Sequence, residues 1–377
     1  MDCKYLLYCG GCPHRNLSEK AYRELKINHF NQALQHLKGQ NYQVNPPVFI
    51  ADGLRRRAAL TFRYEKKKLL LGFNENSSHN ITDIDFCCAL TSELNRILLP
   101  LKSMLSDLCA QPYSFKQGKK ISTKYLTQGD VLICAADNGL DIVLEYDAPL
   151  DVNARMIFAE FCQNNDDVIR LSHRRNISDS AETLVQKIAP VVKMGKYSVP
   201  IPAGTFLQAS SSGEQALADL VVKSLQGAKG KVADLFCGVG TFSYYLNSHL
   251  NDIKILAIDS GAELLEGFKN SLNANQIGNI EIKKQNLFKY PLLAEEIAKF
   301  DAIVFDPPRS GAKEQCKQIA LASPKPQTIV AVSCNPLTFI NDANILIEAG
   351  YNLCEITLID QFVYSNHSEL VALFKLL

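Results

Sequence analysis

The residue with the clearest chemical potential is Cys334, in the run Val332-Ser-Cys-Asn-Pro336, which follows an apolar segment. A cysteine at the end of a buried strand lies near the edge where open α/β sheets bind their ligands, and its thiolate is a strong nucleophile. A lone cysteine there is more often a small buried residue. The Ser-Cys-Asn-Pro context favours covalent catalysis instead.

A second strand-end motif, Asp306-Pro-Pro-Arg-Ser-Gly311, precedes Cys334 by one helix and one strand. The carboxyl ends of parallel strands meet at one edge of the sheet. We therefore expect Asp306 and Cys334 to lie at the same edge.

A third motif, Val232-Ala-Asp-Leu-Phe-Cys-Gly-Val-Gly-Thr241, ends one predicted strand and opens a helix. Gly238 and Gly240 permit a tight turn beside a ligand, and Asp259, 19 residues after Gly240, ends the next strand where it could accept hydrogen bonds from a ribose. No Gly-Lys-Ser/Thr follows, so the motif is not a phosphate-binding loop. A nicotinamide dinucleotide stays open, although Ser243 occupies the position of the third glycine of that fingerprint.

Cysteines also gather near the N-terminus, as Cys3-x5-Cys9-x2-Cys12, with Cys87-Cys88 far downstream. In a reducing compartment such clusters bind metal more often than they form disulfides. Four thiolates without a required histidine suit a [4Fe–4S] cluster. Zinc is the alternative, because four-cysteine sites also bind it and His14 is nearby.

The second half of the chain is built from regularly alternating elements that must position these motifs. Such alternation predicts a parallel sheet with helices on both faces. The final apolar runs, 351–362 and 369–377, have no helix between them and predict an antiparallel hairpin at the sheet edge. The predicted strands are 231–237, 254–259, 280–285, 300–306 and 327–333, and the predicted helices are 213–226, 241–249, 262–276, 312–322 and 336–349.

The first half has a different character. After the cysteines, Ser18 is a candidate N-cap for a helix extending to Leu37, and 55–195 has a mixed α+β pattern. The punctuated segment Val199-Pro-Ile-Pro-Ala-Gly-Thr marks the entry to the second domain. We expect two domains, 1–195 with α+β architecture and 196–377 with a Rossmann-like α/β fold.

Composition narrows the class of protein. The 377 residues carry a formal net charge of +1, which argues against a protein that coats nucleic acid non-specifically but permits a local basic face. Arg55-Arg-Arg57, Arg63 and Lys66-Lys-Lys68 form the most basic segment. Such a run is commonly a solvated face, but next to an RNA-modifying domain it suggests phosphate contacts.

No signal peptide and no apolar run of roughly 18 residues is evident, which predicts a cytoplasmic protein outside the membrane.

The strings Asp234–Gly240, Asp306–Gly311 and Ser333–Pro336 together resemble those of the bacterial RNA uracil-5-methyltransferases. The resemblance extends over nearly the whole chain and implies a class I methyltransferase fold that uses S-adenosylmethionine. It implies that Cys334 attacks carbon 6 of uracil. It also implies a cofactor site that comprises Gln208, Phe236, Thr241, Asp259, Asn286 and Asp306, of which Asn286 replaces an acidic residue often found there.

The same resemblance assigns a catalytic base. The family places a glutamate in a Phe-Pro-x-Thr-x-His-x-Glu setting, and this chain has Phe362-Val-Tyr-Ser-Asn-His-Ser-Glu369. Val363 replaces the proline and Ser365 the threonine. Without the resemblance, Glu369 would be interpreted as a solvent-exposed strand residue.

The branch that carries an iron–sulfur cluster and modifies 23S ribosomal RNA is the most similar, which implies cluster ligands Cys3, Cys9, Cys12 and Cys88. Cys88-Ala-Leu fits the fourth position better than Cys87, and the expected role is structural. The β-barrel RNA-binding domain that often precedes these cysteines is expected to be missing, because Cys3 is almost the first residue. The expected partner is RNA, most simply 23S rRNA near position 747, with position 1939 and tRNA position 54 as alternatives; no obligate protein partner is evident.

Other classes of function fit less well. Cytosine-5 RNA methyltransferases with two active-site cysteines have one in the Pro-Pro region, where this chain has none, and amino-methyltransferases need no nucleophile such as Cys334. A small-molecule methyltransferase would not need the cysteine-rich N-terminus. A non-catalytic iron–sulfur RNA-binding assembly factor would have no use for Cys334, Asp306 and Glu369 together.

Overall fold

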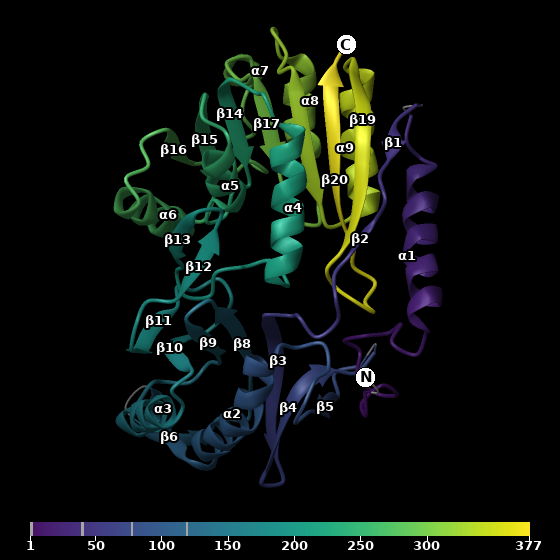
Figure 1. Cartoon of the computed structure of the whole chain (residues 1–377). Helices are drawn as coiled ribbons and strands as arrows, with labels where there is room; N and C mark the ends of the chain where they lie inside the picture. The colour runs from purple at the N-terminus through teal and green to yellow at the C-terminus, as the bar shows by residue number, and fades with distance from the viewer. Residues whose placement is uncertain (1–2, 39–40, 77, 118–119) are drawn as a thin grey trace. The chain divides into compact units, whose positions relative to one another are not determined.

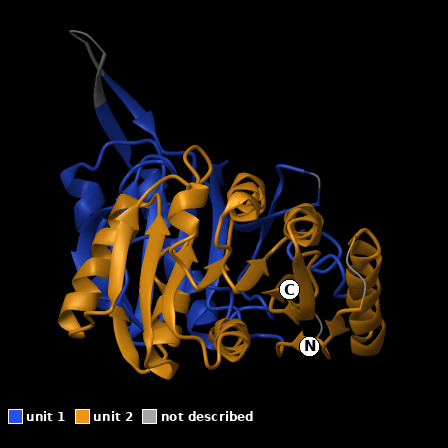
Figure 2. Ribbon diagram, turned by 90° about the horizontal axis from the view of Figure 1, so that it is seen from above, with its two compact units in different colours: residues 1–16, 52–192, 200–210 blue, residues 17–51, 193–199, 211–377 orange. Residues whose placement is uncertain are grey.

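The computed structural model describes residues 3–38, 41–76, 78–117 and 120–377. The chain forms two compact units, each assembled from separated segments (Figure 2). Unit 1 comprises 1–16, 52–192 and 200–210, and unit 2 comprises 17–51, 193–199 and 211–377. The division expected from the sequence, 1–195 and 196–377, was contiguous, whereas here the segment 17–51 belongs to the same unit as the C-terminal half.

The sheet of unit 2 confirms the predicted Rossmann-like α/β fold (Figure 1). Its strand order is β1-β19-β20-β18-β17-β14-β15-β16, with β2 also paired to β19. Neighbours from β18 to β16 are parallel, and β20 is antiparallel to both β18 and β19. The strands are β14 (Gly230–Leu235), β15 (Ile253–Asp259), β16 (Ile280–Lys284), β17 (Ala302–Phe305), β18 (Thr328–Ser333), β19 (Tyr351–Asp360) and β20 (Glu369–Leu376).

Burial explains why the central strands are uniformly apolar. All four residues of β17 and all six of β18 are buried, as expected for parallel strands covered on both faces. In Figure 1, α4 lies in front of the sheet and α8 and α9 lie behind it. The helices of this unit are α1 (Glu19–Leu34), α4 (Ser211–Ser224), α5 (Thr241–His249), α6 (Ala262–Ala274), α7 (Ala294–Ile297), α8 (Lys313–Leu321) and α9 (Pro336–Glu348).

The C-terminal hairpin forms as predicted, but it does not end the sheet. β1 (Gln43–Val44) and β2 (Val48–Phe49) both pair with β19 in parallel. An unpaired strand edge offers backbone N–H and C=O groups, and the segment after α1 occupies this one. Ser18 caps α1 as expected, since its side chain accepts a hydrogen bond from the backbone N–H of Ala21.

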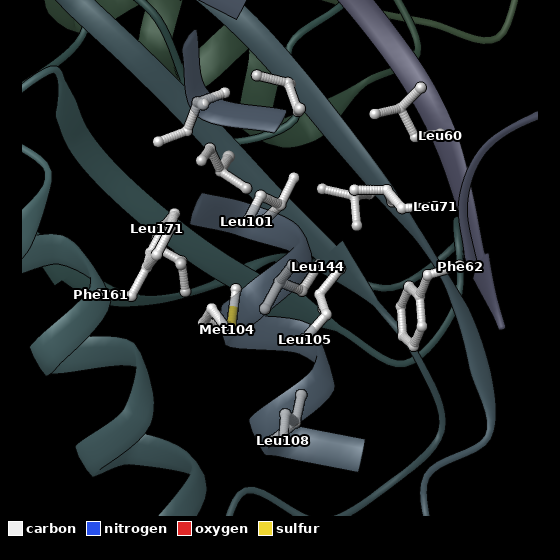
Figure 3. Close-up of a cluster of buried hydrophobic side chains, with 14 of the residues drawn as sticks. Leu60, Phe62, Leu71, Leu101, Met104, Leu105, Leu108, Leu144, Phe161 and Leu171 are labelled. Atoms are coloured by element: carbon white, nitrogen blue, oxygen red, sulfur yellow. The ribbon is translucent and has the colours of Figure 1, made fainter. Parts of the chain in front are cut away.

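Unit 1 contains a mixed sheet of order β11-β10-β9-β8-β3-β4-β5. Two helices, α2 (Ser92–Ala110) and α3 (Val152–Asn164), pack against it around a core of aliphatic and aromatic side chains (Figure 3). The sheet strands are β3 (Arg57–Glu65), β4 (Lys68–Asn74), β5 (Ile81–Asp83), β8 (Gln128–Ala136), β9 (Gly139–Glu145), β10 (Val168–Arg174) and β11 (Glu182–Gln186).

Two short hairpins complete the described elements. β6 (Pro112–Gln117) pairs with β7 (Lys120–Tyr125), and β12 (Val191–Met194) pairs with β13 (Tyr197–Pro200). Within the described ranges, no helix has the length and apolar character needed to cross a membrane.

Candidate active site

The turn between β14 and α5 has the backbone that its glycines predict. Gly238 and Gly240 adopt φ values of 56° and 89°, the left-handed region that favours glycine. A Cβ on Gly240 would lie 2.1 Å from the ring of Phe268, so only glycine fits there, whereas a Cβ on Gly238 would meet no atom within 4 Å. The turn therefore leaves open space above Gly238 at the carboxyl edge of the sheet.

Asp259 lies at the end of β15, as predicted, and holds this turn in place. Its Oδ2 accepts from the backbone N–H of Gly238 at 3.0 Å, and its Oδ1 accepts from that of Gly261 at 2.8 Å. Each carboxylate oxygen has capacity for a further hydrogen bond. Asp259 is thus both a support for the glycine turn and a potential ligand for a ribose.

Asp234 explains why a serine replaces the third glycine of the dinucleotide fingerprint. The fully buried Asp234 accepts from both the backbone N–H and the hydroxyl of Ser243, at 3.0 and 2.6 Å. Its Oδ1 has no hydrogen-bond partner among the described residues. Burial raises the pKa of Asp234 to about 7. The sequence alone indicated no interaction between these two residues.

The loops after β17 and β18 are tied together at the same sheet edge. The backbone carbonyl of Arg309 accepts from the side chains of Asn335 and Thr338, each at 3.1 Å. Farther along the first loop, the N–H of Ala312 donates to Asp342 of α9 at 2.7 Å. The Asp306–Gly311 and Ser333–Pro336 motifs are consequently held side by side.

Cys334 lies directly between β18 and α9 and is partly exposed. Asn335 caps α9, accepting from the N–H of Leu337 at 3.1 Å, and Pro336 occupies the first turn. Burial, followed by the nearby carboxyl groups of Glu369 and Asp306, raises the pKa of the Cys334 thiol to about 11, against the lowering effect of Arg309. The thiol is thus the resting form at neutral pH.

Glu369 begins β20 and is buried, with 5% of its surface exposed, so an interpretation as a solvent-exposed strand residue is wrong. Because β20 lies between β18 and β19, the pairing of Leu370 with Ser333 brings Glu369 to the strand end that carries Cys334. Burial, and then the charge of Asp306, raise the pKa of Glu369 to about 8. The amide of Gln361 donates to it at 3.4 Å.

Asp306 and Arg309 complete the electrostatics of this group. Desolvation, with a contribution from Asp234, raises the pKa of Asp306 to about 7. A guanidinium nitrogen of Arg309 lies 2.9 Å from Nε2 of His367, and its charge lowers the pKa of both Cys334 and Glu369. Sequence reasoning assigned no role to Arg309, although its position in the Asp-Pro-Pro-Arg string was the available signal.

The other predicted cofactor residues each occupy a different local environment. Thr241 is the first residue of α5, and the ring of Phe236, at φ 63°, packs 5.3 Å from that of Phe288. Asn286 accepts from the backbone N–H groups of Phe288 and Lys289, each at 3.1 Å. Gln208 belongs to unit 1, where its carbonyl accepts from Arg56 at 3.1 Å.

In unit 1, all five clustered cysteines line a single cavity, together with Arg15 and Arg55. The N-terminal segment approaches closely, since the N–H of Gly10 donates to the carbonyl of Asn74 at 3.0 Å, where a Cβ on Gly10 would be 2.8 Å from that oxygen. The cysteines are Cys3, Cys9, Cys12, Cys87 and Cys88. In the part of the chain that the structure describes, no group of three or more Cys, His, Asp or Glu side chains is arranged to hold a metal ion.

The basic segment divides into two parts. Arg56 is buried, and the guanidinium of Arg57 lies 3.8 Å from the ring centre of Phe206, so these arginines support the fold of unit 1. Lys66 and Lys67 are exposed in the turn between β3 and β4, with φ values of 49° and 62°. The exposed lysines of this turn are therefore better placed to contact phosphates than Arg56 and Arg57 are.

A family model described as tRNA (Uracil-5-)-methyltransferase matches residues 21–376. An uncharacterised RNA methyltransferase of Mesorhizobium japonicum is 34% identical over 98% of this chain and 83% of its own length. A 23S rRNA (uracil(1939)-C(5))-methyltransferase of Vibrio vulnificus is 28% identical over 99% of this chain and 81% of its own.

A similar fold is found in a solved structure, the Pyrococcus abyssi tRNA (uracil-54, C5)-methyltransferase in complex with S-adenosyl-L-homocysteine. The TM-score is 0.73 at 22% identity, covering 97% of this chain and 86% of that one. The likeness extends over both units and supports the fold.

Proposed function

Because the chain belongs to the tRNA (uracil-5-)-methyltransferase family and is an S-adenosylmethionine-dependent RNA (uracil-C5)-methyltransferase, we propose that it methylates its uridine through a covalent bond between Cys334 and carbon 6. The observation that carries this proposal is the convergence of Cys334, Glu369, Asp306 and Arg309 at the ends of three neighbouring strands, where the charges of Asp306 and Arg309 shift the pKa values of Cys334 and Glu369.

The chemistry requires a nucleophile and a base. Carbon 5 of uracil is a poor nucleophile, and addition of the Cys334 thiolate at carbon 6 makes an enolate whose carbon 5 is electron-rich. S-adenosylmethionine, when bound, supplies an electrophilic methyl group. A base must then take the carbon 5 proton, so that the C6–S bond breaks and the thiolate leaves. We assign this step to Glu369, because its buried carboxyl lies at the strand end that carries Cys334.

The raised pKa values describe the ligand-free state. With a pKa of about 11, Cys334 must lose its proton when it attacks, and a positive charge nearby favours that loss. Arg309 is one such charge within the protein. Glu369, with a pKa of about 8, accepts the carbon 5 proton only once it is ionised.

The residues at the β14, β15 and β17 ends suit the cofactor. The space above Gly238 and the spare hydrogen-bonding capacity of Asp259 provide room and a polar partner for a nucleoside. We propose cofactor contacts for Gln208, Phe236, Thr241, Asp259, Asn286 and Asp306.

Replacing Asp259 with Ala should weaken binding of S-adenosylmethionine by about 1.5–3 kcal/mol, the loss of a charge-assisted hydrogen bond. The loss includes loosening of the turn, because Asp259 also accepts from Gly238 and Gly261. Titration calorimetry measures the effect. Asp252→Ala, which removes an exposed carboxylate directly before β15, is the matched control. An unchanged dissociation constant for Asp259→Ala would show that the Asp259 carboxylate does not contact the cofactor.

For the RNA target we propose 23S rRNA, with tRNA uridine 54 as the alternative. The relative that acts on 23S rRNA aligns over 99% of this chain, whereas the tRNA enzyme supports only the fold. Mass mapping of both RNAs from a deletion strain decides between them, since one uridine should lack its methyl group. Loss of a methyl group from tRNA alone would overturn the assignment. We place this activity in the cytoplasm, where rRNA is available.

A non-catalytic RNA-binding assembly factor is the remaining alternative. Such a protein would form no covalent complex with RNA and would show no turnover. Release of labelled S-adenosylhomocysteine by the purified protein in the presence of 23S rRNA would exclude it.

We further propose that Cys3, Cys9, Cys12 and Cys88 hold a [4Fe–4S] cluster in the cavity that they line. The donor set is suitable because it consists of thiols with Arg15 and Arg55 nearby to offset the negative charge. The Cys88 thiol is hydrogen-bonded to that of Cys3, which favours Cys88 over Cys87 as the fourth ligand. The cluster would join the N-terminal segment to the rest of unit 1.

Anaerobically purified protein should be brown, with about four iron and four sulfide per chain. Serine at Cys9, Cys12 or Cys88 should bleach it, whereas Cys87→Ser, the adjacent control, should not. Iron and sulfide analysis with the visible absorption spectrum tests this. Stoichiometric zinc without iron in such a preparation would contradict the assignment.

A further inference from the structure

Lys26 is a buried cation with no part in the site described so far. It lies on α1 with only 3% of its surface exposed, and a lysine is almost never so buried unless it is paired. Its Nζ lies 3.2 Å from Oδ1 of Asp360, which is 1% exposed. One helical turn earlier on the same face, the hydroxyl of Tyr22 donates to the other oxygen of Asp360 at 2.7 Å.

The same ammonium group also holds the loop that ends at Glu369. Lys26 donates to the backbone carbonyls of Ser365 and His367, at 3.2 and 2.5 Å. Asp360 is the last residue of β19, and Glu369 is the first of β20. A single charge therefore ties the start of the connection 361–368 to its end.

The loop itself has a conformation that local sequence does not favour. Tyr364 adopts φ 61°, which is unusual for a bulky residue, and its ring packs 4.6 Å from that of Tyr22. A turn bond from the N–H of Ser365 to the carbonyl of Phe362, at 2.9 Å, closes the loop. Contacts from α1 thus support a backbone that would otherwise relax.

The same loop also contacts residues of the candidate active site. The ring of His367, whose carbonyl Lys26 holds, contacts the guanidinium of Arg309, and Gln361 donates to Glu369. Displacement of this loop would move Glu369, the residue that follows it, whereas the backbone of Arg309 stays held by Asn335 and Thr338 of the loop after β18 and of α9. The position of a catalytic base within about an ångström governs its efficiency.

We propose that Lys26, with Tyr22 and Asp360, is a positioning residue that anchors the 361–368 loop and so sets Glu369 for removal of the carbon 5 proton. The proposal rests on the assignment of Glu369 as the base. Lys26 acts after methyl transfer: it affects the release of the product and leaves the attack by Cys334 largely unchanged.

The test compares two steps of one reaction in the full-length protein. The double variant Lys26→Met, Asp360→Asn removes the anchor without leaving one charge buried alone. Tyr22→Phe is a milder second variant that keeps the ring against Tyr364. Lys20→Met, an exposed lysine on the same helix, is the control. Thermal unfolding confirms that each variant is folded.

With target RNA and labelled S-adenosylmethionine, single-turnover methyl transfer by the double variant should stay within about twofold of wild type. Release should slow at least about tenfold, which is part of the roughly 10²- to 10⁴-fold that a positioned general base contributes. The methylated covalent complex should accumulate accordingly. A purely structural role would lower both steps in parallel, and that result, or an unchanged partition, would overturn the proposal.

A second readout does not depend on activity. Hydrogen exchange of the amides in 361–369 should be faster in the double variant than in wild type and in Lys20→Met, because two carbonyl contacts are lost. If Glu369→Gln accumulates no methylated complex, the proposed role of Glu369 as the base is wrong. Hydrogen exchange then remains as the test of whether Lys26 anchors the loop. Unchanged protection of 361–369 would overturn it.

Discussion

Glu369→Gln, incubated with target RNA and labelled S-adenosylmethionine, should become trapped as a covalent complex that carries the methyl group. The adduct can form and accept the methyl group, but carbon 5 keeps its proton, so the C6–S bond cannot break. Turnover should fall by roughly 10²- to 10⁴-fold, the usual contribution of a general base. A slowly migrating labelled band on a denaturing gel measures the trapped species.

The matched control is Glu355→Gln, a glutamate on β19 of the same hairpin and outside the candidate site. It should turn over as wild type does. Product release by the wild type should rise with pH toward about 8, because burial and Asp306 keep Glu369 protonated below that value and only the ionised carboxylate accepts a proton. Near wild-type turnover of Glu369→Gln would mean that another group is the base.

Cys334→Ala should abolish both methylated product and covalent complex. Removal of a covalent nucleophile costs on the order of 10⁶-fold in other enzymes, which is below detection here. The partly exposed thiol lies at a strand end and not in the core, so we expect the variant to stay folded and to bind S-adenosylmethionine. Gel analysis and product counting measure the two losses.

Combining the variants separates the two roles. The labelled band of Glu369→Gln should vanish in the Cys334→Ala, Glu369→Gln double variant, because no adduct can form. Cys354→Ala, a partly exposed cysteine on β19, is the control and should behave as wild type. A covalent complex that survives Cys334→Ala would show that a different residue attacks the uracil.

The local sequence pattern was sufficient to predict most of the strands and helices of unit 2. The alternation of apolar runs and amphipathic segments predicted β14 to β20 and five helices to within about two residues, because helix and strand periodicities are encoded in neighbouring residues. The strand-end positions of Asp259, Asp306 and Cys334 followed directly, since parallel strands present their carboxyl ends at one edge.

Features that depend on contacts between residues far apart in the sequence became evident only from the tertiary structure. Glu369 is buried only because β20 inserts between β18 and β19, and its pKa depends on Asp306, a residue from a different strand end. Lys26 meets Asp360 and the carbonyl of His367 across more than three hundred residues of chain. A short sequence window contains one partner of each pair and not the other. The sequence by itself therefore determined the elements and the candidate nucleophile, whereas the burial of Glu369 and the contacts of α1 with the loop before it come from packing that brings distant segments together.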